Sequence, residues 1–191
     1  MTIPRIIGLY SSSPQAGKTT IANLLAGHNY VRVSFADPLR EMLIPLLTTL
    51  GYSETAARHR LTEAKHLTIP ELGVTPRHLL QTLGTEWGRS CVHPEVWLKT
   101  WQARVDRLLA EGHNVVTDDV RFPNEAALFE KYPHAELWCV LRIDAAPKSS
   151  HASDGALDDY SNFDRHIHNH HSLAALTKQI SDIFSQFYAA S

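Results

Sequence analysis

The sequence predicts an α/β fold in which helices cover both faces of a central parallel sheet of about five strands. Three observations lead to this prediction. Short apolar runs alternate with longer stretches of helical periodicity, which is typical of βαβ units. A Gly-Lys-Thr string joins the first apolar run to the first helical stretch. The 191 residues, 43% of them hydrophobic, suffice for one sizeable core, so we expect a single domain over residues 1–191.

The N-terminal elements follow the order of a βαβ unit. A strand is expected at residues 5–10, a helix at 18–25 and a second strand at about 30–35. Asp37 and Pro38 then begin another helix, because aspartate is a good N-cap and proline suits the first helical position.

The middle of the chain is predicted to be mainly helical. Residues 52–76 lack a clear period and are expected to be irregular. Helices are predicted at residues 77–89 and 94–111, and Gly112 ends the second of them.

The C-terminal part returns to alternation. A short buried strand at residues 114–117 ends in two aspartates, and a helix at 123–130 leads to a strand at 136–143. Residues 165–169 are expected to form the last strand. A final helix, capped by Ser172, carries an apolar stripe: Leu173, Leu176, Ile180, Ile183 and Phe187.

The strongest local signal is the segment GLYSSSPQAGKTT, residues 8–20. It fits the phosphate-binding spacing G-x-x-x-x-G-K-[ST], except that Ser12 stands where the first glycine is usual. Such a loop turns backbone N–H groups around phosphate oxygens at a helix N-terminus, whose dipole favours anions. Gly17 would let the backbone come close, Lys18 would reach the β- and γ-phosphates, and Thr19 would ligate Mg²⁺ directly.

Three further segments are SFADPLRE (34–41), TPRHLLQTLGTEWGR (75–89) and DDVRFPNEA (118–126). Together with the phosphate loop, in this order and approximate spacing, they resemble the phage-type deoxynucleoside monophosphate kinases. The resemblance runs from about residue 5 to about residue 180. It implies a P-loop NTPase three-layer sandwich, with a helical monophosphate-binding insertion at about 37–111 and a lid at about 144–163.

The resemblance also implies an activity, its ligands and their residues. Such an enzyme moves the γ-phosphoryl group of Mg-ATP to a deoxynucleoside 5′-monophosphate, for the supply of DNA precursors. The residues matched to ATP are Ser13, Ala16, Gly17, Lys18, Thr19, Thr20 and Arg142, and Arg142 is equally well interpreted as an exposed strand-end arginine. Those matched to the monophosphate are Asp37, Arg77, Gln81, Gly84, Thr85, Trp97, Asp119, Arg121 and Glu125.

Lys18, Arg121 and Asp119 are the expected catalytic residues. A 5′-phosphate is already largely a dianion at neutral pH, so no general base is expected, and Asp119 would hold Mg²⁺ through water or orient Arg121. Ordinary polar strand ends remain the alternative for Asp118 and Asp119. Two further departures from the family pattern are Thr19, where aspartate is frequent, and the string His151-Ala152-Ser153-Asp154, where His-x-Ser-Glu is frequent.

Residues 144–163 are polar and irregular. A loop of this length within a compact domain is usually functional or disordered. We expect a mobile lid that orders over ATP and keeps water from the reaction.

Charge and composition exclude several classes of partner. The formal net charge of −2 provides no basic field for nucleic acid. No apolar run approaches the length of about 20 residues that spans a bilayer, and the first residues lack a secretory signal pattern. Cys91 and Cys139 are expected to be buried thiols in a reducing compartment. We therefore expect a soluble cytoplasmic protein, in the host cytoplasm if phage-encoded; the oligomeric state is open, with a homodimer among the possibilities.

A histidine-rich segment near the C-terminus resembles a metal site in composition. Strand alternation puts His166, His168 and His170 on one face. No cysteine is near and a carboxylate ligand would have to come from elsewhere, so structural zinc is disfavoured.

Two other functions stay open. One is a P-loop kinase for a ribonucleotide, a nucleoside or a coenzyme precursor. The other is a nucleotide-binding regulator or ATPase without a small acceptor, against which stand the small size and the absence of a basic stripe.

Overall fold

The computed structural model describes residues 5–13, 15–142, 156–170 and 172–189. Its internal contacts divide the chain into two compact units. The sheet unit comprises Met1–Ser34 and Ala103–Ser191, and the helical unit comprises Phe35–Gln102. Most of the predicted insertion at residues 37–111 therefore coincides with the helical unit; that this unit binds a monophosphate stays a prediction.

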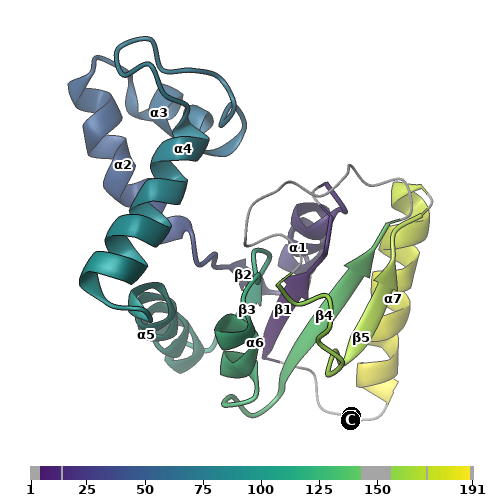
Figure 1. The fold of residues 1–191 in the computed structure, drawn as a ribbon. Helices are drawn as coiled ribbons and strands as arrows, with labels where there is room; N and C mark the ends of the chain where they lie inside the picture. Colours follow the sequence, from purple (N-terminus) through teal and green to yellow (C-terminus); the bar gives the residue numbers. More distant parts are fainter. Residues whose placement is uncertain (1–4, 14, 143–155, 171, 190–191) are drawn as a thin grey trace. The chain divides into compact units, whose positions relative to one another are not determined.

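Five parallel strands form the sheet of the sheet unit (Figure 1). Their order is β2-β3-β1-β4-β5, so that β1 lies in the centre between β3 and β4. The α/β fold class with its parallel five-stranded sheet is confirmed. The strands are β1 (Ile6–Tyr10), β2 (Tyr30–Arg32), β3 (Asn114–Thr117), β4 (Ala135–Leu141) and β5 (Arg165–His168).

Helices cover both faces of this sheet. Ile7 and Leu9 of β1 belong to a buried cluster with residues of α1 (Lys18–Ala26) and α7 (Leu173–Ala189). Because side chains alternate along a strand, Gly8 faces the other side. There a Cβ atom on Gly8 would come within 2.5 Å of Cζ of Phe129, the last residue of α6 (Pro123–Phe129). The result is three layers, helices–sheet–helix, as the sequence predicts.

The helical unit has an apolar core of its own. Its buried members come from successive helices and from the chain between them: Leu43, Ile44, Leu47, Ala57, Leu61 and Ile69. The elements are α2 (Asp37–Thr49), α3 (Glu54–Thr62), α4 (Pro76–Gln81), the π-helix η1 (Thr82–Val92) and the first part of α5 (Val96–Ala110).

One helix was not predicted. Residues 52–76 were expected to be irregular, but α3 forms within them. Ser53 caps it, since its hydroxyl accepts a hydrogen bond from the Ala56 N–H at 3.2 Å. The helix buries only Ala57 and Leu61, so its sequence has a weak apolar period, and the capping signal was the one available clue.

The predicted helix at 77–89 is only partly α-helical. It changes after Gln81 into the wider π-helix η1, which continues to Val92. Trp97 packs against this segment: its indole N–H donates to the Gly84 carbonyl at 2.7 Å, and its ring fills the space where a Gly88 side chain would lie. π-Helical segments are rare and occur frequently at functional sites.

Smaller corrections concern single residues. Ala36, not Asp37, is the N-cap of α2; Asp37 is inside the first turn, where it accepts a 2.7 Å bond from Arg40. Strand β2 ends at Arg32 rather than near residue 35. Cys139 is buried as expected, whereas Cys91 is exposed, and both are free thiols.

The predicted lid lies in part outside the described residues, including His151, Ser153 and Asp154. Its C-terminal end, residues 156–163, is described and packs on the sheet unit, with Leu157 fully buried. Among the described residues, none of the helices combines the length and the apolar character needed to cross a membrane.

Candidate functional site

The segment between β1 and α1 forms a loop at the carboxyl edge of the sheet. Gly17 has φ of +103°, a left-handed conformation that favours glycine, and Gln15 also has a positive φ of 58°. Lys18 is the first residue of α1, so the loop leads directly into a helix N-terminus. Backbone N–H groups in such a position bind anions. The structure therefore gives the predicted phosphate loop its expected setting.

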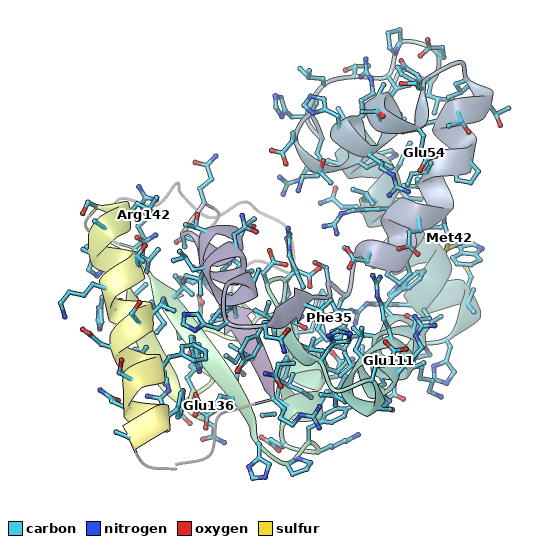
Figure 2. All side chains as sticks on the ribbon, turned by 180° about the vertical axis from the view of Figure 1, so that it is seen from behind. Phe35, Met42, Glu54, Glu111, Glu136 and Arg142 are labelled. Atoms are coloured by element: carbon cyan, nitrogen blue, oxygen red, sulfur yellow. The ribbon has the colours of Figure 1, made fainter. Side chains whose placement is uncertain are left out.

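Two side chains that follow the neighbouring strands β5 and β4 donate hydrogen bonds to backbone carbonyls of this loop. Asn169, directly after β5, donates from Nδ2 to the Ala16 carbonyl at 2.8 Å. A Cβ atom at residue 17 would come too close to the same amide nitrogen, so a larger residue there would displace the Asn169 side chain. Arg142, directly after β4, donates from Nη1 to the Gln15 carbonyl at 3.3 Å. Figure 2 shows Arg142 and Glu136 at the two ends of β4.

A buried carboxylate faces the start of α1. Asp118 follows β3 and is only 5% exposed. Its Oδ2 accepts a hydrogen bond from the Thr19 hydroxyl at 3.0 Å, and its Oδ1 accepts one from the Ser34 hydroxyl at 3.0 Å. Arg32, the last residue of β2, forms an ion pair with Oδ2 at 2.7 Å. Four residues from three separate parts of the chain thus converge beside the phosphate loop.

The pair of Thr19 and Asp118 fits a magnesium ion. Mg²⁺ prefers oxygen ligands in octahedral geometry at about 2.0–2.1 Å, which puts adjacent ligand atoms about 2.9 Å apart. The observed 3.0 Å between Thr19 Oγ1 and Asp118 Oδ2 suits two neighbouring positions around such an ion. From the sequence, Asp119 rather than Asp118 was expected to hold Mg²⁺ through water or to orient Arg121. Asp119 is half-buried on the next position of the chain, and its role stays a prediction.

A cavity of about 270 Å³ adjoins the loop. It includes Arg142, whose assignment to ATP stays a prediction, and two histidines whose ring nitrogens, His168 Nδ1 and His170 Nε2, are 3.4 Å apart. Within the described residues no group of three or more potential metal-binding side chains occurs, so this segment shows no complete zinc site there. The lining residues are Ser11, Ser12, Ser13, Val140, Leu141, Arg142, His168 and His170.

The described end of the predicted lid is attached next to the phosphate loop. Tyr10, the last residue of β1, donates its hydroxyl to Asp158 Oδ1 at 2.8 Å, and its ring stacks on Phe163 at 5.4 Å. Burial, together with the hydrogen bond to Asp158, raises the pKa of the Tyr10 hydroxyl, which therefore stays protonated and remains a donor. This part of the predicted lid is held to the sheet.

The predicted acceptor residues after β3 differ in burial, since Glu125 is buried and Arg121 is exposed. Glu125 is 2% exposed and its Oε2 accepts the backbone N–H groups of Arg121 at 2.8 Å and Phe122 at 3.1 Å. These bonds cap the start of α6, which gives Glu125 a structural task. The side chain of Arg121 is exposed. Binding of the monophosphate by Glu125 and Arg121 stays a prediction.

The other predicted acceptor residues lie in the helical unit. Asp37 pairs with Arg40, Arg77 is exposed near the start of α4, and Gln81 is half-buried at its end. Thr85 is exposed on η1 and Gly84 is buried beneath it, where a side chain would come within 3.2 Å of Leu39.

Trp97, one of the residues matched to the monophosphate, is buried within the helical unit. It is 4% exposed, with its N–H bonded to Gly84 and its ring against Gly88. The exposed aromatic side chain of η1 is that of Trp87, at 43%. The binding role of Trp97 stays a prediction. Trp87 is the tryptophan whose side chain is exposed enough to contact a ligand. Trp101 is 1% exposed and belongs to the core.

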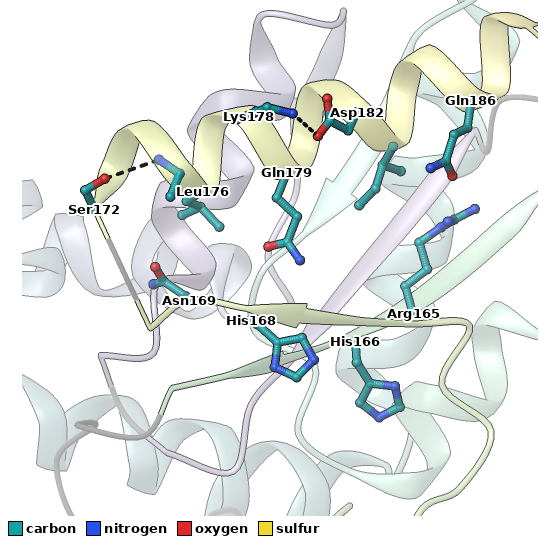
Figure 3. Close-up of a pocket in the computed structure, with 12 residues that line it drawn as sticks. Arg165, His166, His168, Asn169, Ser172, Leu176, Lys178, Gln179, Asp182 and Gln186 are labelled. Atoms are coloured by element: carbon teal, nitrogen blue, oxygen red, sulfur yellow. Dashed lines mark hydrogen bonds and ion pairs between the residues drawn. The ribbon is translucent and has the colours of Figure 1, made fainter.

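A larger cavity of about 640 Å³ lies between β5 and α7 (Figure 3). Arg165 and Asn169 point from β5 toward the helix, whereas His166 and His168 point to the opposite side of the strand. The lining includes no residue of the phosphate loop and no residue of the Asp118 cluster. It is a surface groove beside the edge strand.

Comparisons with known proteins give one curated relative and structural neighbours. No protein-family model matches the chain. Over 104 residues it is 31% identical to the deoxynucleoside-5'-monophosphate kinase of Escherichia phage T5, covering 51% of this chain and 40% of that protein. The chain thus spans less than half the length of the curated relative that it matches.

Two solved structures resemble the chain over almost its whole length. A dephospho-CoA kinase from Campylobacter jejuni has a TM-score of 0.50 at 13% identity, covering 96% of this chain and 97% of that one. A Thermus thermophilus protein has a TM-score of 0.43 at 18% identity, covering 97% and 98%. The first of these shows that the chain shares the fold of that dephospho-CoA kinase.

Proposed function

We propose that this protein is an ATP-dependent kinase that transfers the γ-phosphoryl group to a deoxynucleoside 5′-monophosphate, giving ADP and a deoxynucleoside diphosphate. The observation that carries the proposal is the pairing of Thr19 with Asp118 beside a loop that ends in Gly17 and Lys18. The similarity to the phage T5 enzyme supports the choice of acceptor.

The donor side of the reaction is assigned to the sheet unit. Lys18 at the N-terminus of α1 would neutralise the β- and γ-phosphates of ATP. Ser13, Ala16, Gly17 and Thr20 would surround the phosphates through the loop backbone and the first turn of α1. Mg²⁺, held by Thr19 and Asp118, supplies charge neutralisation between the phosphates when it is bound.

For the acceptor, we propose Arg121 and Asp119 of the sheet unit as phosphate-binding residues, and we propose the matched residues of the helical unit separately. A dianionic monophosphate must approach the polyanionic donor, so it needs cations of its own. Arg121 and Arg77 are suited to this because a guanidinium binds two phosphate oxygens at once. Gln81 offers both a donor and an acceptor group to a base edge.

The chemistry requires positioning rather than proton transfer. The second pKa of a phosphate monoester is about 6, so the attacking oxygen is already largely ionised at neutral pH. We therefore assign no general base. In-line placement and neutralisation of the transferred group provide the rate enhancement.

An acceptor panel tests the proposal. The purified protein is incubated with Mg-ATP and each common dNMP or NMP in turn, and nucleotide products are separated by chromatography. We expect formation of the corresponding dNDP from at least one dNMP. Failure of every dNMP, with product from another acceptor, would contradict the assignment.

The fold shared with a dephospho-CoA kinase favours one additional acceptor class, the coenzyme precursors. Dephospho-CoA is therefore included in the same panel. A dNMP and dephospho-CoA present the protein with different reacting groups, a phosphate and a ribose hydroxyl. Phosphorylation of the hydroxyl would call for a general base, which the proposed mechanism does not contain.

A further inference from the structure

One carboxylate oxygen of Asp118 has two partners, a hydroxyl that donates a hydrogen bond and a guanidinium that forms an ion pair. Its Oδ2 receives the Thr19 hydroxyl at 3.0 Å and the Arg32 guanidinium at 2.7 Å. Its Oδ1 is occupied by the Ser34 hydroxyl at 3.0 Å. The side chain of Asp118 is 3% exposed, whereas that of Arg32 is 41% exposed.

Strand register fixes this arrangement. Arg32 at the end of β2 is paired with Val116 of β3, two residues before Asp118. Side chains two residues apart lie on the same side of a strand, so the guanidinium reaches along β3 to the carboxylate. A buried carboxylate without a counter-ion would be strongly unfavourable. In the protein without metal, Arg32 supplies that counter-ion.

We propose that Arg32 is the resident counter-ion of Asp118 and that a divalent metal ion replaces it there. Both cations require Asp118 Oδ2, since this is the oxygen that also faces the Thr19 hydroxyl. Arg32 is partly in water already, so its guanidinium can leave the carboxylate at low cost. Until the metal ion arrives, the ion pair with Arg32 holds the Asp118 carboxylate in place beside Thr19.

This inference rests on the metal site of the proposed function but not on the acceptor or on turnover. Its test uses Mn²⁺ alone, without nucleotide, and measures free Mn²⁺ by electron paramagnetic resonance during titration of the full chain. Removing the competing charge in Arg32→Gln should tighten Mn²⁺ binding by about three- to fivefold, which is the upper part of the range for a partly exposed ion pair. A false kinase assignment would appear in the acceptor panel and would leave this result unchanged.

Three further variants test whether the gain in Mn²⁺ binding comes from the loss of the Arg32 charge beside Asp118. Arg32→Lys keeps the charge and should bind Mn²⁺ within about twofold of the unmodified protein. Asp118→Asn combined with Arg32→Gln should lose the added binding. Arg58→Gln removes a similar arginine from an exposed ion pair with Glu54 and serves as the control for net charge. Equal or weaker Mn²⁺ binding by Arg32→Gln, or an equal gain in Arg58→Gln, would overturn the proposal.

A second measurement needs no substitution, in case Arg32→Gln does not fold. Adding Mg²⁺ to the ¹⁵N-labelled protein should move the side-chain Nε–H resonance of Arg32, because its ion pair opens. The corresponding resonance of Arg165, which pairs with Glu136 at 2.8 Å, should stay in place. An Arg32 signal that does not respond at saturating Mg²⁺ would show that the pair persists and that the exchange does not occur.

Discussion

Asp118 is the residue that connects the proposed metal site with the first turn of α1, through its hydrogen bond with Thr19. Asp118→Asn keeps the size of the side chain and an acceptor oxygen but removes the charge. Loss of one preorganised electrostatic contact typically costs on the order of 10²–10³ in turnover. We expect a fall of that size in kcat, with a thermal unfolding midpoint close to that of the unmodified protein. A variant that keeps turnover within threefold would remove Asp118 from the site.

Arg121 tests the acceptor side. A charge-assisted contact is worth about 1.5–3 kcal/mol, or roughly one to two decades. Arg121→Ala should therefore lower kcat/KM for the dNMP at least tenfold and leave ATP binding nearly unchanged. Arg121→Lys should recover little, because an ammonium group cannot make two parallel bonds. Loss of ATP affinity with an unchanged KM for the dNMP would assign Arg121 to the donor side instead.

A substitution at Gly88 tests how the π-helix η1 packs against Trp97. Helix propensity alone favours alanine over glycine by about 1 kcal/mol. Packing predicts the opposite sign, because a Cβ atom at Gly88 would come within 2.6 Å of Nε1 of Trp97, which is buried and bonded to Gly84. We expect Gly88→Ala to destabilise the protein by about 1–3 kcal/mol in urea unfolding. Glu86→Ala, at an exposed position of the same helix, is the control; a stabilised Gly88→Ala would contradict the packing of Trp97.

The attachment of residues 156–163 to β1 depends on the Tyr10 hydroxyl. Tyr10→Phe keeps the ring stacked on Phe163 but removes the 2.8 Å bond to Asp158, and should cost about 1–2 kcal/mol of unfolding free energy. The raised pKa means that this contribution is present below pH 10.0, the ordinary pKa of a tyrosine, and is lost at higher pH. The difference between the two proteins should therefore shrink above pH 10.0. Tyr160→Phe, which loses a longer bond of 3.3 Å to Glu130, should have a smaller effect.

The elements that could be predicted are those with strong local signals. β1, α1 and the loop between them follow from an apolar run and a phosphate-binding string, and they form as expected. α3 has a weak apolar stripe and was missed. The change from α4 to η1 depends on Trp97 packing against Gly84 and Gly88, a tertiary contact that no local period contains.

Only the part of the site that lies in one short segment of the sequence could be predicted. Gly17, Lys18 and Thr19 are neighbours in sequence, so a linear motif identifies them. Arg32 and Asn169 were missed because their positions depend on strand register and on which strand ends lie beside the loop. The choice between Asp118 and Asp119 required the burial of the first, which their adjacency in the sequence does not reveal.

The fold shared with a dephospho-CoA kinase and the phosphate loop suit the proposed transfer to a small acceptor. A net charge of −2 suits this better than a function on nucleic acid, since local cations suffice for a small phosphorylated ligand. An ATPase with the same loop would hydrolyse ATP without an acceptor. The two functions differ in the ratio of their products.

That ratio is the most direct test of the central claim. ADP and phosphorylated acceptor are measured together during turnover of Mg-ATP with the best dNMP of the panel, with Lys18→Ala as the matched inactive variant. We predict one ADP for each dNDP, little ADP without acceptor, and loss of both products in Lys18→Ala by on the order of 10²–10³. ADP release at the same rate with and without dNMP, or turnover within threefold of the unmodified protein in Lys18→Ala, would contradict the account.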